Sequence, residues 1–139
     1  MNPAPTAPKP LIADIWHSFR SLPGWVQIWV ALILMPVNMA SAAFTHEPAG
    51  LWIALLANGA MVLNLPVMVH ERGFSKFMAV PHLIPWTLLV VLIAIIQPPL
   101  EGPFGIYLWT LFAVDLVSLI FDYPDAVKWF RGERDVAGR

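Results

Sequence analysis

Long stretches without a charged residue alternate with short charged segments along this chain. No Asp, Glu, Lys or Arg occurs in Ser21–His46, Pro48–His70 or Phe77–Leu100. A fourth apolar stretch, Gly102–Phe121, contains one charged residue, Asp115. About 20 apolar residues in a helix cross the hydrocarbon core of a bilayer, and each stretch is long enough to do so. We therefore predict four transmembrane helices, at Trp25–Phe44, Leu51–Val69, His82–Gln97 and Phe104–Phe121.

The composition agrees with a membrane protein and excludes other classes. Of the 139 residues, 58 % are hydrophobic and 12 % are charged. In a soluble domain, about 45–50 % of the residues are apolar and about 25 % are charged. A disordered chain needs low hydrophobicity and high charge, so this class is excluded too. Because backbone groups in lipid must be paired internally and no strand alternation is visible, the predicted fold is an all-α integral membrane bundle. Its linkers are short, which favours antiparallel neighbouring helices.

The basic residues fall on one side of this arrangement. All 8 precede the first span, lie between the second and third, or follow the fourth: Lys9, Arg20, Arg72, Lys76, Lys128, Arg131, Arg134 and Arg139. The two opposite loops contain His46, Glu47 and Glu101. By the positive-inside rule, we expect a multi-pass protein of a cell inner (cytoplasmic) membrane with both termini in the cytoplasm. The net charge is −1, so no basic field predicts a nucleic-acid partner.

An alternative topology has three spans. The small residues Ala40–Ser41–Ala42–Ala43 resemble a signal-peptidase site, and cleavage after Ala42 would place the new N-terminus outside. The apolar core of a signal peptide is about 7–15 residues long. The apolar run that begins at Trp25 is longer, and a long segment precedes it. We therefore favour four spans.

Both ends of the chain are predicted to lie outside the bilayer core. Residues 1–10 are rich in proline and are expected to form a disordered tail. Residues 11–22 have apolar side chains at helical spacing with polar ones between them, which predicts an amphipathic interfacial helix. The transmembrane domain then covers residues 23–121. Residues 122–139 are expected to form a juxtamembrane cytoplasmic helix, with Pro124 in its first turn, and a tail.

Four polar side chains lie within the predicted spans. Asp115 is the first candidate for function, because a charged group in the middle of a membrane costs several kcal/mol. By distance along the helices, Asn64 is expected near the depth of Asp115, and Asn38 near that of Asn58. We expect these side chains to form two polar layers that join helices. Asp115 has two possible roles, a structural carboxyl or a group that binds a proton, an ion or a partner.

Two histidines flank the predicted middle loop. His70 ends the second span, His82 begins the third, and Glu71 is adjacent to His70. Histidines at equal depth on neighbouring helices could bind haem or, with the glutamate, a metal ion. Their spacing lacks the pairing of a strong metal motif, and interfacial histidines also cap helix ends. We expect no cofactor and keep a haem or metal site as an alternative.

Basic and aromatic residues alternate in the middle loop. The residues expected to contact lipid headgroups or a partner are Arg72, Phe74, Lys76 and Phe77, with Lys128 and Arg131 near the C-terminus. Such a pattern orients a protein and anchors it in the interface. It is also typical of binding to anionic lipid or a docking partner.

The third span is expected to pack at the periphery. Leu88–Ile96 contains no polar side chain, and a helix that is apolar all round suits contact with lipid or with a hydrophobic partner. The first, second and fourth spans would then share the polar interior.

No motif in the sequence predicts catalysis. The chain has no phosphate loop, serine nucleophile elbow, zinc-protease helix or internal repeat, and it has no cysteine. We therefore expect a non-enzymatic membrane accessory or scaffold protein. Its partners would be the lipid bilayer and a second copy or another membrane protein. The alternatives are a proton- or ion-coupled transporter or channel that uses Asp115, and a redox subunit that binds haem or metal through His70 and His82.

Overall fold

The computed structural model describes residues 10–139, and the regular elements in this range are helices. The predicted Pro-rich tail, residues 1–10, lies outside the described residues except for Pro10. The continuous helices are α1 (Leu11–Arg20), α4 (Gly50–Glu71), α5 (Val80–Ile96) and α6 (Gly102–Phe130). The helix α1 lies where a helix is predicted, and its location in a membrane interface stays a prediction.

The first span is an irregular helix. It consists of α2 (Gly24–Ile28), the π-helical segment η1 (Trp29–Leu34), α3 (Met35–Met39) and the 3₁₀ segment η2 (Ala40–Phe44). Pro36 lies two residues after the end of the π-helical segment and has no N–H to donate to the preceding turn. A wider turn before proline accommodates this missing hydrogen bond, so we attribute the irregularity to Pro36.

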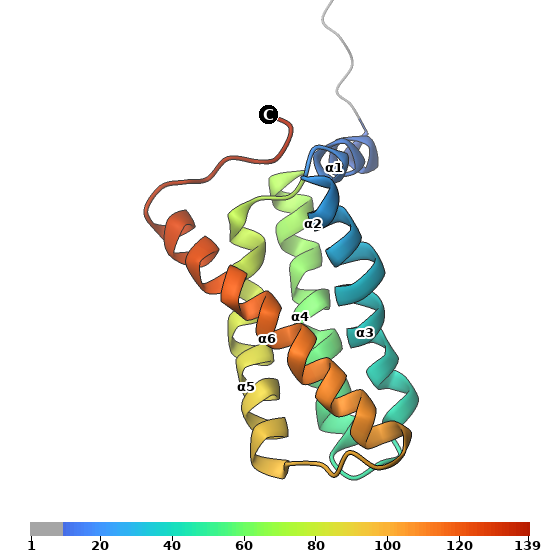
Figure 1. The fold of residues 1–139 in the computed structure, drawn as a ribbon. Coiled ribbons are helices and arrows are strands. Elements are labelled where there is room, and N and C mark those ends of the chain that lie inside the picture. Colours follow the sequence, from blue (N-terminus) through green and yellow to red (C-terminus); the bar gives the residue numbers. More distant parts are fainter. Residues whose placement is uncertain (1–9) are drawn as a thin grey trace, which may run out of the picture.

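The prediction of four spans is confirmed. Within residues 10–139, four helices are long and apolar enough to cross a membrane: Gly24–Phe44, Gly50–Glu71, Lys76–Ile96 and Gly102–Phe130. The third of these joins the 3₁₀ segment η3 (Lys76–Ala79) to α5. Successive helices run in opposite directions and form one bundle (Figure 1).

The separate C-terminal helix predicted for residues 122–139 is not present. Instead α6 continues through Pro124 to Phe130. Its added turns pack along η3, where Ala126 is buried and the rings of Trp129 and Phe77 lie 4.3 Å apart. This packing compensates for the backbone hydrogen bond that a proline removes from a helix.

The expectation that the third span packs peripherally is wrong. The helix α5 packs along both α4 and α6 (Figure 1). Its side chains His82, Trp86, Leu89 and Ile93 are buried at helical spacing and form part of the core. The least buried span is the first, with 17 % of its apolar window buried. In a membrane, lipid-facing and protein-facing side chains are both apolar, so an apolar sequence does not reveal which helix is central.

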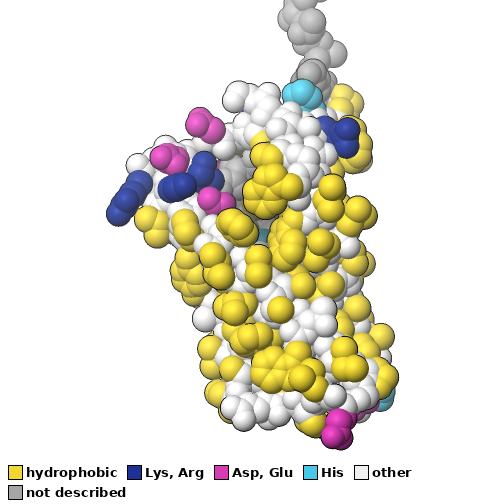
Figure 2. Space-filling model, viewed as in Figure 1, with side chains coloured by type: hydrophobic (Ala, Val, Ile, Leu, Met, Phe, Trp, Pro, Cys, Tyr) yellow, Lys and Arg dark blue, Asp and Glu magenta, His cyan; other side chains and the backbone are white. Residues whose placement is uncertain are grey.

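The two ends of the bundle differ. We call the end formed by α1, residues 72–79 and the C-terminal segment (residues 131–139) the terminal end. The opposite end, with the loops at residues 45–49 and 97–101, is the far end (Figure 1). On the face seen in Figure 2, Lys and Arg side chains gather at the terminal end together with acidic side chains, whereas the charged side chains at the far end are acidic.

The C-terminal segment folds back across the terminal end (Figure 1). Ala137 donates its N–H to the Phe74 carbonyl over 2.8 Å, and an isolated antiparallel bridge joins Ser75 to Val136. The Arg139 guanidinium donates to two carbonyl oxygens at the end of α4. The last residues of the chain are therefore part of the wall at this end.

Candidate ligand cavity

A large cavity opens at the terminal end. Its volume is about 990 Å³, and it lies between the first span and α1 on one side and α6 with the C-terminal segment on the other. Figure 2 shows a hollow in the surface at this end. Aromatic side chains form much of its wall: Trp16, Phe19, Trp25, Trp29, Phe74, Trp86 and Phe121. The cavity therefore offers an apolar surface to whatever enters it.

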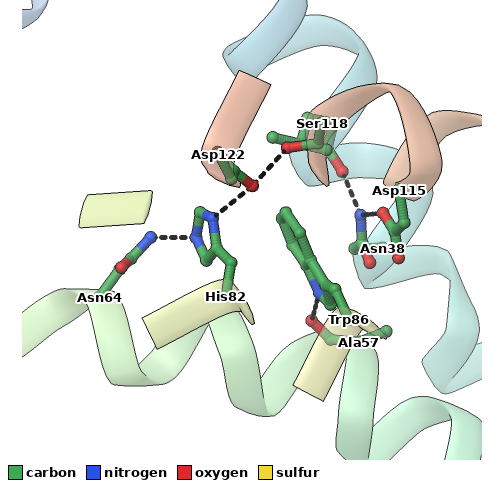
Figure 3. Close-up of polar contacts among 9 residues, drawn as sticks. Asn38, Ala57, Asn64, His82, Trp86, Asp115, Ser118 and Asp122 are labelled. Carbon is green, nitrogen blue, oxygen red and sulfur yellow. Dashed lines mark hydrogen bonds and ion pairs between the residues drawn. The ribbon is translucent and has the colours of Figure 1, made fainter. Parts of the chain in front are cut away.

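A row of polar side chains borders the cavity on its inner side. Asn64 comes from α4, His82 from α5, and Ser118 and Asp122 from α6 (Figure 3). The Ser118 hydroxyl donates to Asp122 Oδ2 over 3.0 Å, and His82 Nδ1 lies 3.4 Å from the same oxygen. The Asn64 amide nitrogen contacts His82 Nε2. We call these four residues the polar floor of the cavity.

The His82 ring is held in place from three directions. Its two nitrogens meet Asp122 and Asn64, and the Trp86 ring stacks on it at a centroid distance of 4.1 Å. Trp86 is fully buried, and its indole N–H donates to the Ala57 carbonyl over 3.2 Å. A neutral imidazole donates at one nitrogen and accepts at the other, which matches a carboxylate on one side and an amide N–H on the other. The arrangement fixes the ring orientation and leaves Asn64 Oδ1 as a buried acceptor with no partner among the described residues.

Asp115 lies deeper and pairs with a different asparagine from the one expected. Asn38 donates to Asp115 Oδ1 over 2.7 Å and to the Leu34 carbonyl over 2.9 Å (Figure 3). Both side chains are fully buried, and among residues 10–139 Asp115 Oδ2 and Asn38 Oδ1 have no hydrogen-bond partner. Neither residue lines the cavity, although Leu34 and Ser118 do. The pair therefore joins the first span to α6 behind the cavity.

The other predicted asparagine contacts are also different. Asn64 meets His82 and not Asp115, and Asn58 donates to the Ser41 hydroxyl over 2.9 Å. The two expected layers, Asn64 with Asp115 and Asn38 with Asn58, are therefore wrong. The depths were counted from predicted helix ends, and α6 continues well beyond its predicted end. The central position of α5 also brings a histidine between the second and fourth spans.

The two histidines proposed as haem or metal ligands differ in their surroundings. His70 is exposed in the last turn of α4, whereas His82 is buried with both ring nitrogens in contact with other side chains. Glu71 Oε1 accepts a weak hydrogen bond, 3.4 Å long, from Ser75. Among the described residues, no three His, Asp or Glu side chains are grouped so that they could hold a metal ion. The geometry therefore gives the haem or metal alternative no support.

The middle-loop residues proposed for lipid or partner contact face other parts of the same chain. Their contacts are Arg72 with Asp14 (2.7 Å), Phe74 with Phe19 (ring centroids 5.6 Å), Lys76 with Glu133 (3.9 Å) and Phe77 with Trp129 (4.3 Å). By contrast, Lys128 and Arg131 are exposed. The loop thus builds the terminal end, and the exposed pair keeps its predicted role toward headgroups or a partner.

Sequence reasoning missed Ser118, Asp122 and Trp86 as members of a site. The spacing of Asp115, Ser118 and Asp122, three and four residues apart, places them along one face of a helix. This spacing was a detectable signal, but the assignment of residue 122 to the start of a new helix concealed it. The cavity itself has no counterpart in the sequence pattern.

Comparison with protein-family models, curated proteins and solved structures finds no match to this chain.

Proposed function

We propose that this protein binds an amphipathic small molecule in the cavity at the terminal end. The observation that carries the proposal is a cavity of about 990 Å³ with aromatic walls and a polar floor contributed by α4, α5 and α6. Ligand sites commonly measure about 300–1,000 Å³ and combine an apolar lining with a few convergent polar groups. Protein interiors otherwise pack with few voids larger than a water molecule.

The lining of the cavity favours a ligand with two chemically different parts, one apolar and one polar. The wall toward the first span and α1 is rich in Trp and Phe, while the floor presents a carboxylate, an imidazole, an amide and a hydroxyl. An alkyl chain or apolar ring system would lie against the aromatic wall, and a polar head would reach the floor. Under the positive-inside rule, we expect the terminal end to face the cytoplasm.

The cavity favours ligand binding over the other functions that the sequence allows. An accessory or scaffold protein needs no such cavity, and that role stays a prediction. Transport coupled to Asp115 also stays a prediction, because this carboxyl is bonded to Asn38 and does not line the cavity.

Photolabelling in liposomes tests the proposal. A long-chain alcohol that carries a diazirine would label lipid-facing residues without saturation and cavity residues, such as Met61 and Met78, with saturation. We expect excess unlabelled alcohol to abolish only the cavity label. Ser118→Phe, which fills the cavity from α6, should remove the cavity label, and Thr110→Phe on the exposed face of the same helix should preserve it. Cavity labelling that never saturates, or that is equal in both variants, would refute the proposal.

A further inference from the structure

The charges around the cavity specify its ligand further, given the proposed function. Five residues with formal charges line it: Asp122, Asp125, Asp135, Lys76 and Arg139. The two basic side chains have acidic partners, because Lys76 lies 3.9 Å from Glu133 and Arg139 lies 3.7 Å from Asp14. The cavity therefore contains positive charge that is already paired.

The acidic side chains of α6 are not paired in this way. Asp122 and Asp125 lie about one turn apart on α6 and both line the cavity. Within the described residues, neither has a Lys or Arg nitrogen within 4.0 Å of its carboxylate. Lys76 and Lys128 act on Asp125 only through longer-range electrostatic attraction. The Asp122 contacts, from Ser118 and His82, both reach Oδ2, which leaves Oδ1 without a described donor. The Asp122 carboxylate of the floor, with Asp125 beside it on the cavity wall, thus offers negative charge and one acceptor oxygen without a described donor.

A second acceptor lies beside this carboxylate. Asn64 lines the cavity and is 8 % exposed, and its Oδ1 has no hydrogen-bond partner in the part of the chain that the structure describes. Figure 3 shows this oxygen directed away from His82 while the amide nitrogen faces the ring. A buried acceptor without a donor costs free energy, so a ligand that brings donors is favoured over one that brings only acceptors.

We propose that the ligand is a cationic amphiphile, a protonated primary or secondary amine on an apolar body. An ammonium group supplies positive charge together with N–H donors, which complement Asp122 and Asp125. Aromatic walls also favour a cation over an anion, because the face of an aromatic ring carries partial negative charge. A phosphate or sulfate head would instead meet two carboxylates and would be repelled.

Competition between matched 12-carbon amphiphiles tests this inference. The protein is placed in zwitterionic nanodiscs at pH 7 and labelled with the diazirine alcohol, and dodecylamine, dodecanol or dodecyl sulfate is added as competitor. We expect dodecylamine to displace the cavity label at a concentration about tenfold lower than dodecanol, as charge-assisted hydrogen bonds allow. Dodecyl sulfate should be the weakest competitor.

Variants separate a specific head site from partitioning into the lipid. Asp122→Asn with Asp125→Asn should remove the preference for dodecylamine over dodecanol. Asp125→Asn alone should reduce the preference, and it removes no described hydrogen bond, so folding is preserved. Glu101→Gln at the far end removes the same charge away from the cavity and should keep the full preference.

The outcomes distinguish the two proposals. If all three amphiphiles compete equally, or if the preference survives in both Asp variants, the cationic ligand is wrong and the binding cavity stands. If no amphiphile displaces the label and labelling never saturates, the proposed function itself is wrong.

Discussion

The two ends of the bundle are built from similar apolar residues, yet one is closed and the other is hollow. At the far end the backbone segments touch, because a Cβ on Gly50 would lie 1.9 Å from the Phe44 carbonyl oxygen. A Cβ on Gly105 would lie 2.0 Å from the Pro99 carbonyl oxygen. At the terminal end, aromatic side chains and the C-terminal segment surround a cavity of about 990 Å³.

Hydrogen bonds reinforce this difference. At the far end, the Tyr107 hydroxyl donates to the Val37 carbonyl over 2.5 Å and the Trp109 indole donates to the Pro98 carbonyl over 2.7 Å. These bonds tie side chains to the backbone and complete a closed end. At the terminal end, the polar floor is formed by side chains that contact one another, and Asp122 Oδ1 has no donor among the described residues. The way the elements approach one another, and not their composition, decides where a cavity forms.

The largest predicted loss of stability comes from a substitution that disrupts the closed end. Gly105→Ala forces a Cβ against backbone, which cannot move aside as a flexible side chain can. We expect the free energy of unfolding to fall by about 3 kcal/mol or more. Unfolding of the protein by SDS in mixed micelles measures the change. Gly59→Ala in α4, where a Cβ meets nothing within 4 Å, is the matched control and should change stability by less than about 1 kcal/mol. Equal stability of the two variants would contradict the closed end.

A smaller effect concerns the Asn38–Asp115 pair, which joins the first span to α6 between the two ends. Asn38→Leu removes the donor and leaves a buried carboxyl without its hydrogen bond, so we expect a loss of about 1–3 kcal/mol. Combining it with Asp115→Leu should cost less than the sum of the single changes, because the second change removes the unsatisfied group. A double-mutant cycle in the same SDS assay measures this coupling. Strictly additive effects would mean that the pair does not form.

The smallest effect on stability is predicted for removal of the C-terminal segment, which forms part of the cavity wall at the terminal end. A chain that stops after Gly132 loses the contacts of the C-terminal segment with residues 71–75. We expect stability to change by no more than about 1 kcal/mol, because exposed polar contacts and ion pairs contribute little. Release of bound dodecylamine should become severalfold faster, as measured by the decay of protection from the photolabel. Arg134→Ala, which removes a cation stacked on Trp129 outside the cavity, should leave the rate unchanged. An unaltered rate in the truncated chain would show that the segment does not cover the cavity.

Much of the architecture could be predicted along the chain. The predicted spans begin and end within about two residues of the observed helices at most boundaries; for example, Leu51–Val69 corresponds to α4 (Gly50–Glu71). The C-terminal boundary of α6 was the main error, because a proline that could begin a helix is instead accommodated within one. Of the proposed polar residues, Asp115, Asn38, Asn58 and Asn64 do make polar contacts between side chains, although their partners differ from those expected.

The sequence by itself determined the number of apolar helices, their approximate limits and the gathering of basic residues at one end. These properties depend on the length of apolar runs and on the order of charges, which are one-dimensional. Only the tertiary structure decided that α5 is central, that Asn38 meets Asp115 and that His82 meets Asp122. It alone also revealed the cavity. The physical reason is that lipid and protein interior are equally apolar environments, so hydrophobicity marks a span without marking the face that packs against its neighbours.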